Sequence, residues 1–165
     1  MAGGRDELMQ FLKQLSITPE IIEHPAVFTV EAMMPYMDNC NGVISKNLFL
    51  KDKKKKLWLV SVAAERPVNL SELSKKVGAP GGLRFADESI MIEKLGVAQG
   101  CCTALALFND KANDVKFVLD SVFFDGTHEQ VYFHPMVNTQ TAGLKIEDFK
   151  KFLKTTGHEP ILVTF

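Results

Sequence analysis

The chain has 165 residues, and this length predicts one domain with a hydrophobic core of its own. It is 46% hydrophobic and 24% charged, with a mean hydropathy near zero, as in ordinary globular proteins. The net charge of −1, from 19 basic and 20 acidic residues, excludes a strongly basic protein that binds nucleic acid through bulk charge, although a local basic patch can still serve such a partner.

The cysteines predict a reducing environment. Their number is odd and two are adjacent (Cys40, Cys101 and Cys102), which suits an intracellular protein better than a disulfide scaffold. The first residues show no secretory pattern, and no stretch approaches the ~18 apolar residues of a membrane span. We therefore expect a cytoplasmic protein without a membrane partner.

Short elements are predicted before residue 43. Helical spacing of apolar residues predicts an amphipathic helix from about Asp6, and residues 17–23 can form a short strand that stops at His24-Pro25. Thr29 can cap a short helix that runs through Met33. Residues 43–50 and 57–63 then predict two strands of an antiparallel hairpin, joined by a lysine-rich turn.

Helices and strands alternate irregularly through the rest of the chain. Asn69 and Glu72 resemble a capping box for a helix that Gly78 closes, and Asp87 can cap a second helix through Leu95. Further strands are predicted at residues 101–108, 115–124, 130–134 and 161–165, with a final helix at 146–154. This pattern predicts a single α+β domain over residues 1–165, built around a mixed sheet.

Lys46 interrupts the apolar stripe of the first hairpin strand. Side chains alternate between the two faces of a strand, so Ile44, Lys46 and Leu48 share one face while Ser45 and Asn47 share the other. An ammonium in an apolar stripe loses hydration unless it reaches water or a partner. Either the stem of Lys46 extends past the core to solvent, or its ammonium lies in a cleft and binds a carbonyl, carboxylate or phosphate oxygen. Alternation alone leaves both interpretations open.

Common catalytic motifs are absent from the sequence. It has no phosphate-binding glycine loop, and its four histidines are scattered without zinc-ligand spacing, so neither a cofactor nor a metal is predicted. Cys101 and Cys102 are either small core residues or, less in keeping with their apolar flanks, a thiol nucleophile. His134 either ends a strand before Pro135 or forms a pocket wall. The lysines at 53–56 are either a solvated turn or a contact for phosphates.

Three segments in order carry a resemblance that spans nearly the whole chain. They are EHPAVFTVEA (residues 23–32), KNLFLKD (46–52) and FHPMVNT (133–139). In this order they resemble the free-standing prolyl-tRNA editing proteins, relatives of the editing insertion of bacterial prolyl-tRNA synthetases and of the YbaK-type deacylases, and most of all their alanyl-specific branch. The resemblance implies the fold of these proteins, with a central mixed, mostly antiparallel and partly barrel-like sheet flanked by helices.

The resemblance also implies hydrolysis of the ester in mischarged Ala-tRNA(Pro). Lys46 matches the active-site lysine of the family, which contacts the aminoacyl-adenosine end of the substrate, and Asn47 matches its polar neighbour. His134 matches a pocket histidine that helps to set amino-acid size. The remaining matches are to the small apolar pocket and the G-x-x-x-P substrate loop: Val30, Met33, Gly100 and Thr103. The chain departs from this loop at Ala104, where the family has proline.

A synthetase pocket built for proline cannot strongly reject a smaller amino acid. A second site with a smaller pocket, which admits alanine and excludes proline, would remove the error and complete a double sieve. The implied partners are the acceptor end of tRNA(Pro) and the prolyl-tRNA synthetase, but not DNA. Two alternatives stay open: deacylation of Cys- or Ser-tRNA(Pro), and a non-catalytic module that binds tRNA or the synthetase. The residues expected to contact tRNA are basic: Lys51, Lys53, Lys54, Lys55, Lys56, Lys75, Lys76 and Arg84.

Overall fold

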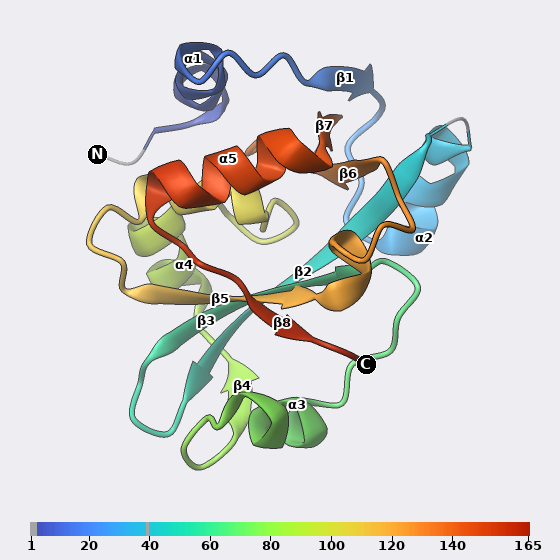
Figure 1. The fold of residues 1–165 in the computed structure, drawn as a ribbon. Helices are drawn as coiled ribbons and strands as arrows, with labels where there is room; N and C mark the ends of the chain where they lie inside the picture. The colour runs from blue at the N-terminus through green and yellow to red at the C-terminus, as the bar shows by residue number, and fades with distance from the viewer. Residues whose placement is uncertain (1–2, 39) are drawn as a thin grey trace.

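The sheet of this protein is mixed, open and eight-stranded, as seen in a computed structural model that describes residues 3–38 and 40–165 (Figure 1). The strand order is β1-β7-β6-β2-β3-β5-β8, and β4 pairs with β2 outside this path. The strands are β1 (Glu20–Glu23), β2 (Gly42–Asp52), β3 (Leu57–Ala63), β4 (Leu83–Phe85), β5 (Val115–Asp120), β6 (Gln130–Phe133), β7 (Gln140–Lys145) and β8 (Ile161–Val163). The expected α+β fold is confirmed, but the sheet does not close into a barrel because β1 and β8 remain its two edges.

Helices cover both faces of the sheet. The helices are α1 (Arg5–Gln14), α2 (Val30–Met33), α3 (Leu70–Val77), α4 (Glu88–Leu95) and α5 (Ile146–Thr156), with 3₁₀ helices η1 (Met34–Met37), η2 (Ala104–Asn109) and η3 (Ser121–Phe123). Leu12 of α1, Leu95 of α4 and Phe149 of α5 belong to one core cluster. Leu73 of α3 belongs to the other, so α3 lies on the opposite side of the sheet from α1 and α5 (Figure 1).

The hairpin of β2 and β3 forms the centre of the sheet, as the alternation of its apolar residues predicts. Successive residues of β3 point to opposite faces, so Leu57 and Leu59 enter one core cluster while Trp58 and Val60 enter the other. All four are buried, which explains why this segment shows no polar face.

Strand β2 is long enough to join two halves of the sheet. Its residues 42–44 pair in parallel with β6, and residues 45–51 pair antiparallel with β3. Glycine is required at position 42, where β2 begins to pair with β6, because a side chain there would collide with the backbone of Gln130. On one edge of β2, residues 42–44 pair with β6 and residues 50–52 pair with β4, so residues 45–49 have no strand beside them on that edge. A pocket opens next to residues 45–47.

Two of the three predicted helix caps are confirmed, whereas Asp87 lies at the start of α4 but makes no capping hydrogen bond through its side chain. The side chains of Thr29 and Asn69 accept hydrogen bonds from the amides of Ala32 (3.1 Å) and Glu72 (3.1 Å), and these two residues cap α2 and α3. Gly78 ends α3 in the left-handed conformation, with φ of 69°. Within the described residues, no helix is long and apolar enough to cross a membrane.

The structure differs from the predicted secondary structure in several places. Residues 101–108 do not form a strand, because Thr103 caps the 3₁₀ helix η2 through the amide of Leu105. A short apolar run cannot be assigned to strand or helix from periodicity alone, and η2 is buried among other elements. Strand β7 was missed. Its Gly143 weakens the β pattern, but it lets the ring of Tyr132 lie against the backbone of β7. The strand predicted at 115–124 ends earlier, at Asp120.

Candidate active site

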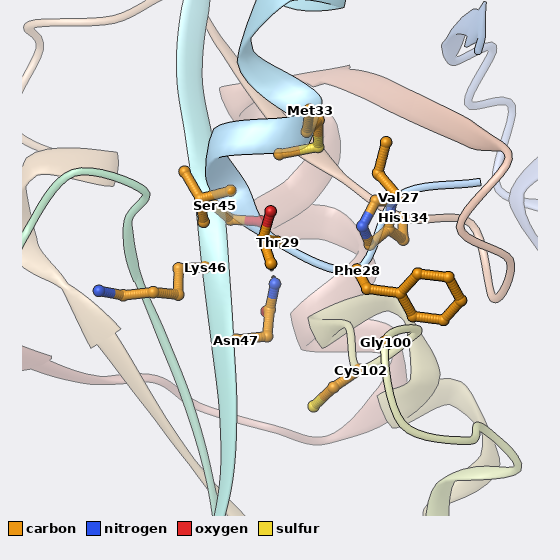
Figure 2. A pocket seen from close by; sticks show the side chains of 11 residues that line it. Val27, Phe28, Thr29, Met33, Ser45, Lys46, Asn47, Gly100, Cys102 and His134 are labelled. Carbon is orange, nitrogen blue, oxygen red and sulfur yellow. Dashed lines mark hydrogen bonds between the residues drawn. The ribbon is translucent and has the colours of Figure 1, made fainter. Parts of the chain in front are cut away.

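A pocket of about 190 Å³ lies beside residues 45–47 of β2 (Figure 2). Its walls come from the segment before α2, from α2 itself, from β2, from the loop before η2 and from the end of β6. The lining residues are Val27, Phe28, Thr29, Val30, Met33, Ser45, Lys46, Asn47, Gly100, Cys102 and His134. The volume is smaller than the 300–1,000 Å³ of pockets that hold drug-sized ligands, so it suits a small chemical group.

Asn47 is held in one orientation inside this pocket. Its Oδ1 accepts a hydrogen bond from the hydroxyl of Ser61 (2.5 Å), and its Nδ2 donates to Oγ of Ser45 (3.1 Å). Ser45 in turn donates to the carbonyl oxygen of Tyr132 (2.7 Å). The amide nitrogen of asparagine has two N–H donors, and the bond to Ser45 uses one. The other N–H is available to an oxygen atom of a ligand.

His134 is a neutral hydrogen-bond acceptor on the opposite wall. Its Nδ1 lies 3.1 Å from the carbonyl oxygen of Gln140, and since a carbonyl only accepts, Nδ1 carries the proton. Burial lowers the pKa of His134, and the nearby ring of His24 lowers it further, against the opposing effect of the bond to Gln140. The imidazole is therefore unprotonated at Nε2 near neutral pH, and this lone pair can accept a hydrogen bond from a ligand.

Helix α2 supplies the apolar part of the pocket. The structure places Val30 and Met33 on the pocket lining, where the sequence predicted them. Met33 is buried, and its sulfur accepts from the hydroxyl of Thr141 (3.8 Å). Thr141, on β7, also forms a hydrogen bond with Nε2 of His24 (2.8 Å), so this one residue connects α2 and the segment before it to β7. This wall is packed from behind and can limit the size of a ligand.

The loop before η2 contributes one of its two predicted residues. Gly100 lines the pocket with φ of 88°, and a side chain at this position would collide with the ring of Phe28. Thr103 does not line it. Its side chain is fully buried, and its hydroxyl caps η2. Cys102 lines the pocket instead, but burial raises the pKa of its thiol to about 12, so it remains protonated and is a poor nucleophile.

Lys46 contributes to the pocket lining, but its ammonium is directed away from the other polar groups. Figure 2 shows its side chain leaving β2 on the side opposite to His134 and Cys102. The Nζ atom donates to the carbonyl oxygen of Arg66 (2.5 Å). This placement follows from the alternation of the strand, which turns Ser45 and Asn47 toward the pocket and Lys46 away from it.

Several residues that line this pocket were not predicted from the sequence. Ser45 could have been found, because it shares a strand face with Asn47. Phe28 and Thr29 lie in the first segment that carries the family resemblance, but nothing in their residue types distinguishes a pocket rim from a helix cap. Phe28 is 73% exposed, which is unusual for a large apolar side chain.

The lysine-rich turn is exposed and firmly anchored. Lys53, Lys54, Lys55 and Lys56 are all exposed, and Lys51 is half-buried. Asp52 is fully buried beneath them and accepts hydrogen bonds from the amides of Lys54 (2.9 Å) and Lys56 (3.0 Å) and from the indole of Trp58 (3.2 Å). Burial by itself raises the pKa of Asp52, but these hydrogen bonds outweigh it and the net pKa is lowered. A buried carboxylate thus fixes the turn that presents the ammonium groups.

Arg84 lies on β4 next to this turn, and the two predicted lysines of α3 lie on the helix that packs against β4. Arg84 is exposed and pairs with Lys51 across β4 and β2. Lys76 donates to the carbonyl of Thr164 (2.8 Å) and lies over the ring of Phe165, while Lys75 is exposed on the same helix. Six of the eight basic residues lie on β2, the turn after it and β4, and two lie on α3, which is bound to β4 by the hydrogen bond from the backbone N–H of Leu83 to Oγ of Ser74 (2.7 Å).

Comparisons with known proteins show the family of this chain. A family model described as the aminoacyl-tRNA editing domain matches residues 24–152. The prolyl-tRNA synthetase associated domain-containing protein 1 of Bos taurus is 58% identical over 100% of this chain and 98% of its own. The prolyl-tRNA editing protein ProX of Acetoanaerobium sticklandii is 31% identical over 89% of this chain and 88% of its own.

A solved structure supports the fold. A crystal structure of a proposed trans-editing enzyme for prolyl-tRNA synthetase matches with a TM-score of 0.65, covering 100% of this chain and 99% of that one. At 18% identity, this match shows a common fold and nothing further. Because the family model covers most of the chain and close relatives align over its whole length, this chain belongs to the aminoacyl-tRNA editing domain family.

Proposed function

We propose that this protein is an aminoacyl-tRNA deacylase that hydrolyses Ala-tRNA(Pro). The observation that carries the proposal is the pocket of about 190 Å³, which combines an amide donor at Asn47 with an imidazole acceptor at His134. An aminoacyl ester presents the complementary groups, a carbonyl oxygen and an α-ammonium group. The names of the relatives, which refer to prolyl-tRNA editing and to prolyl-tRNA synthetase, favour tRNA(Pro) as the RNA.

The two polar walls would orient the aminoacyl group. The free N–H of Asn47 would donate to the ester carbonyl oxygen, while Nε2 of His134 would accept a hydrogen bond from the α-ammonium group. The alanine methyl would then point toward Val30 and Met33 of α2. Such positioning lowers the barrier by holding the ester where water can reach its carbonyl carbon.

Hydrolysis then needs little further chemistry from the protein. A water oxygen bonds to the carbonyl carbon, and the tetrahedral intermediate carries negative charge on the former carbonyl oxygen. The bond between this carbon and the ribose oxygen breaks, and the ribose oxygen takes a proton. The products are alanine and uncharged tRNA. The ribose hydroxyl of the substrate can assist the water, in keeping with Cys102 remaining a neutral thiol.

Lys46 would act after its side chain turns toward the pocket. Its ammonium binds a neutral carbonyl rather than a carboxylate, and its residue is only partly buried, so a change of rotamer exchanges this bond for one to the substrate. From the pocket rim the ammonium would stabilise the negative charge on the tetrahedral intermediate, as an oxyanion hole does.

The size of the pocket would set the amino-acid specificity. Alanine fits against α2, whereas the ring of proline would overlap with Met33, which is buried and cannot move aside freely. Cysteine and serine are close to alanine in size and could bring their polar atoms near Ser45. They are therefore the competing substrates to compare.

The test is deacylation of four charged forms of tRNA(Pro), with alanine, serine, cysteine and proline, at equal enzyme concentration. We expect alanine to be released fastest and proline to remain attached. Faster release of cysteine or serine would reassign the specificity. Binding of Ala-tRNA(Pro) without release at high enzyme concentration would contradict deacylation and favour a non-catalytic module.

A further inference from the structure

A second cavity adjoins the proposed aminoacyl pocket along β2. It has a volume of about 320 Å³, and it shares Asn47, Gly100 and Cys102 with the first pocket. Its other lining residues come from β2, from β4 and the residues after it, from α4 and from the loop that follows: Leu48, Phe49, Phe85, Ala86, Glu88, Met91 and Gln99. Because three residues line both, the two cavities are adjacent, and neighbouring parts of one substrate could occupy them.

The larger cavity has an aromatic wall that faces solvent. Phe85 is 62% exposed, although burial of a ring of this size is strongly favourable. The neighbouring apolar residues Phe49 and Met91 are buried and give the cavity an apolar floor. An exposed ring above an apolar floor is the arrangement in which proteins stack single-stranded bases.

Positive charge follows the same strand beyond this cavity. Lys51 lies four residues after Asn47, about 14 Å along the strand, and Arg84 is its neighbour on β4. The Oδ2 atom of Asp87 lies 4.0 Å from Nζ of Lys51, so the negative charge of this carboxylate partly offsets the positive charge of the lysine. The lysines of the anchored turn come next. The order along β2 is therefore a small polar pocket, an aromatic cavity and then cations.

We propose that the larger cavity binds the terminal nucleoside of the tRNA, with its base stacked on Phe85. The preceding phosphates would run from Lys51 and Arg84 toward the turn at residues 53–56. This subsite rests on the proposed deacylase function, since the ester that occupies the small pocket is attached to the ribose of that nucleoside. Stacking on Phe85 supplies affinity for any base.

The cavity also carries a group that can read an adenine. The side chain of Gln99 lines it, and a carboxamide can donate to one nitrogen of adenine and accept from another at the same edge. The backbone N–H of Gln99 donates a hydrogen bond to the carboxylate of Glu88 (2.7 Å). This bond holds the loop that bears Gln99 against the start of α4. Gln99 would thus be positioned for the base, while Phe85 supplies its stacking surface.

The test uses a short RNA that ends in C-C-2-aminopurine, because the fluorescence of 2-aminopurine falls when its base stacks. We expect quenching with the unmodified protein, retained quenching with Phe85→Trp, and a loss of most of it with Phe85→Leu. The matched control is Leu162→Ala, which shortens another exposed apolar side chain, on the edge strand β8. In deacylation, Phe85→Leu should raise the KM about tenfold and leave kcat near its starting value.

The outcomes separate this subsite from the deacylase function. Equal quenching and equal KM for Phe85→Leu and the unmodified protein would overturn the subsite while leaving deacylation intact. If the unmodified protein releases no amino acid but still quenches the fluorescence of 2-aminopurine, the deacylase function is overturned and the nucleoside subsite is kept. Equal loss of quenching in Phe85→Leu and Leu162→Ala would also overturn it, because a general change in folding would then explain the effect.

Discussion

The two ends of β2 present polar groups in opposite ways. The polar side chains of Ser45 and Asn47 face a small pocket, and hydrogen bonds from Ser61 and to Tyr132 hold them in place. At the other end, beyond Asp52, the ammonium groups face water on an anchored turn. Fixed dipoles stabilise the charge of a transition state, whereas exposed charges attract a polyanion from a distance. In the proposed function, one end of this strand would therefore act in the chemistry and the other would attract the tRNA.

Changes at the pocket end should lower kcat. Asn47→Asp keeps the size of the side chain but replaces the N–H donor with a carboxylate oxygen, which would repel the developing negative charge. We expect kcat for Ala-tRNA(Pro) to fall about 100-fold with a smaller change in KM, as when one oxyanion donor is removed. Single-turnover deacylation measures this. A raised KM with unchanged kcat would instead place Asn47 in substrate capture.

The pH dependence should report the neutral state of His134. Its pKa is lowered below the ordinary value of 6.5, so the acceptor persists below that pH and is lost as the pH falls through the lowered pKa. One pH unit below this pKa only about a tenth of the imidazole stays neutral, and kcat/KM should drop about tenfold. His134→Gln keeps an acceptor that does not titrate and should remove this acid limb. Identical profiles for the two proteins would exclude the role of His134 as acceptor.

Changes at the exposed end should act on KM and on salt dependence. The double variant Lys54→Glu with Lys55→Glu should raise the KM for tRNA about fivefold and flatten its dependence on salt by about one unit of slope per lost contact. Its kcat should not change. The control, Lys13→Glu with Lys145→Glu, alters the net charge equally on exposed residues of other elements. If the two double variants raise the KM equally, the turn does not contact the tRNA specifically and acts only through the net charge of the protein.

The anchored turn should also contribute to stability. Asp52→Asn replaces an acceptor oxygen beneath the turn with a donor, and we expect it to lower the free energy of unfolding by about 1–3 kcal/mol. The folded pKa of Asp52 is lowered, so its contribution is present above the ordinary pKa of 3.8 and is lost as the pH falls through the folded value. Urea unfolding at pH 7 and at pH 3 checks this: the difference between the two proteins should shrink at the lower pH.

The sequence predicted what short-range patterns determine. The hairpin follows from apolar alternation, and the caps at Thr29 and Asn69 follow from residue type. The resemblance placed Val30, Met33, Asn47 and His134 near one pocket, and all four line it. Features that depend on distant contacts were not predictable. The 3₁₀ helix at residues 104–109 and the glycine-containing β7 owe their conformations to what packs against them.

The direction of Lys46 is the clearest case of such a feature. Alternation predicts that it shares a face with Ile44 and Leu48, and its side chain does leave β2 on the side away from the pocket (Figure 2). Nothing in the residues around position 46 indicates the carbonyl of Arg66, which lies 20 residues further along the chain. In the proposed function its ammonium reaches the substrate after a change of rotamer, and the activity of a Lys46 variant tests this role.

The decisive measurement is deacylation of Ala-tRNA(Pro) beside Pro-tRNA(Pro), by the unmodified protein and by Lys46→Ala. We expect the unmodified protein to release alanine and to leave proline attached, and Lys46→Ala to lose at least about 100-fold in kcat with the same unfolding midpoint. Full activity of Lys46→Ala, or equal release of alanine and proline by the unmodified protein, would contradict an alanine-selective deacylase that depends on Lys46.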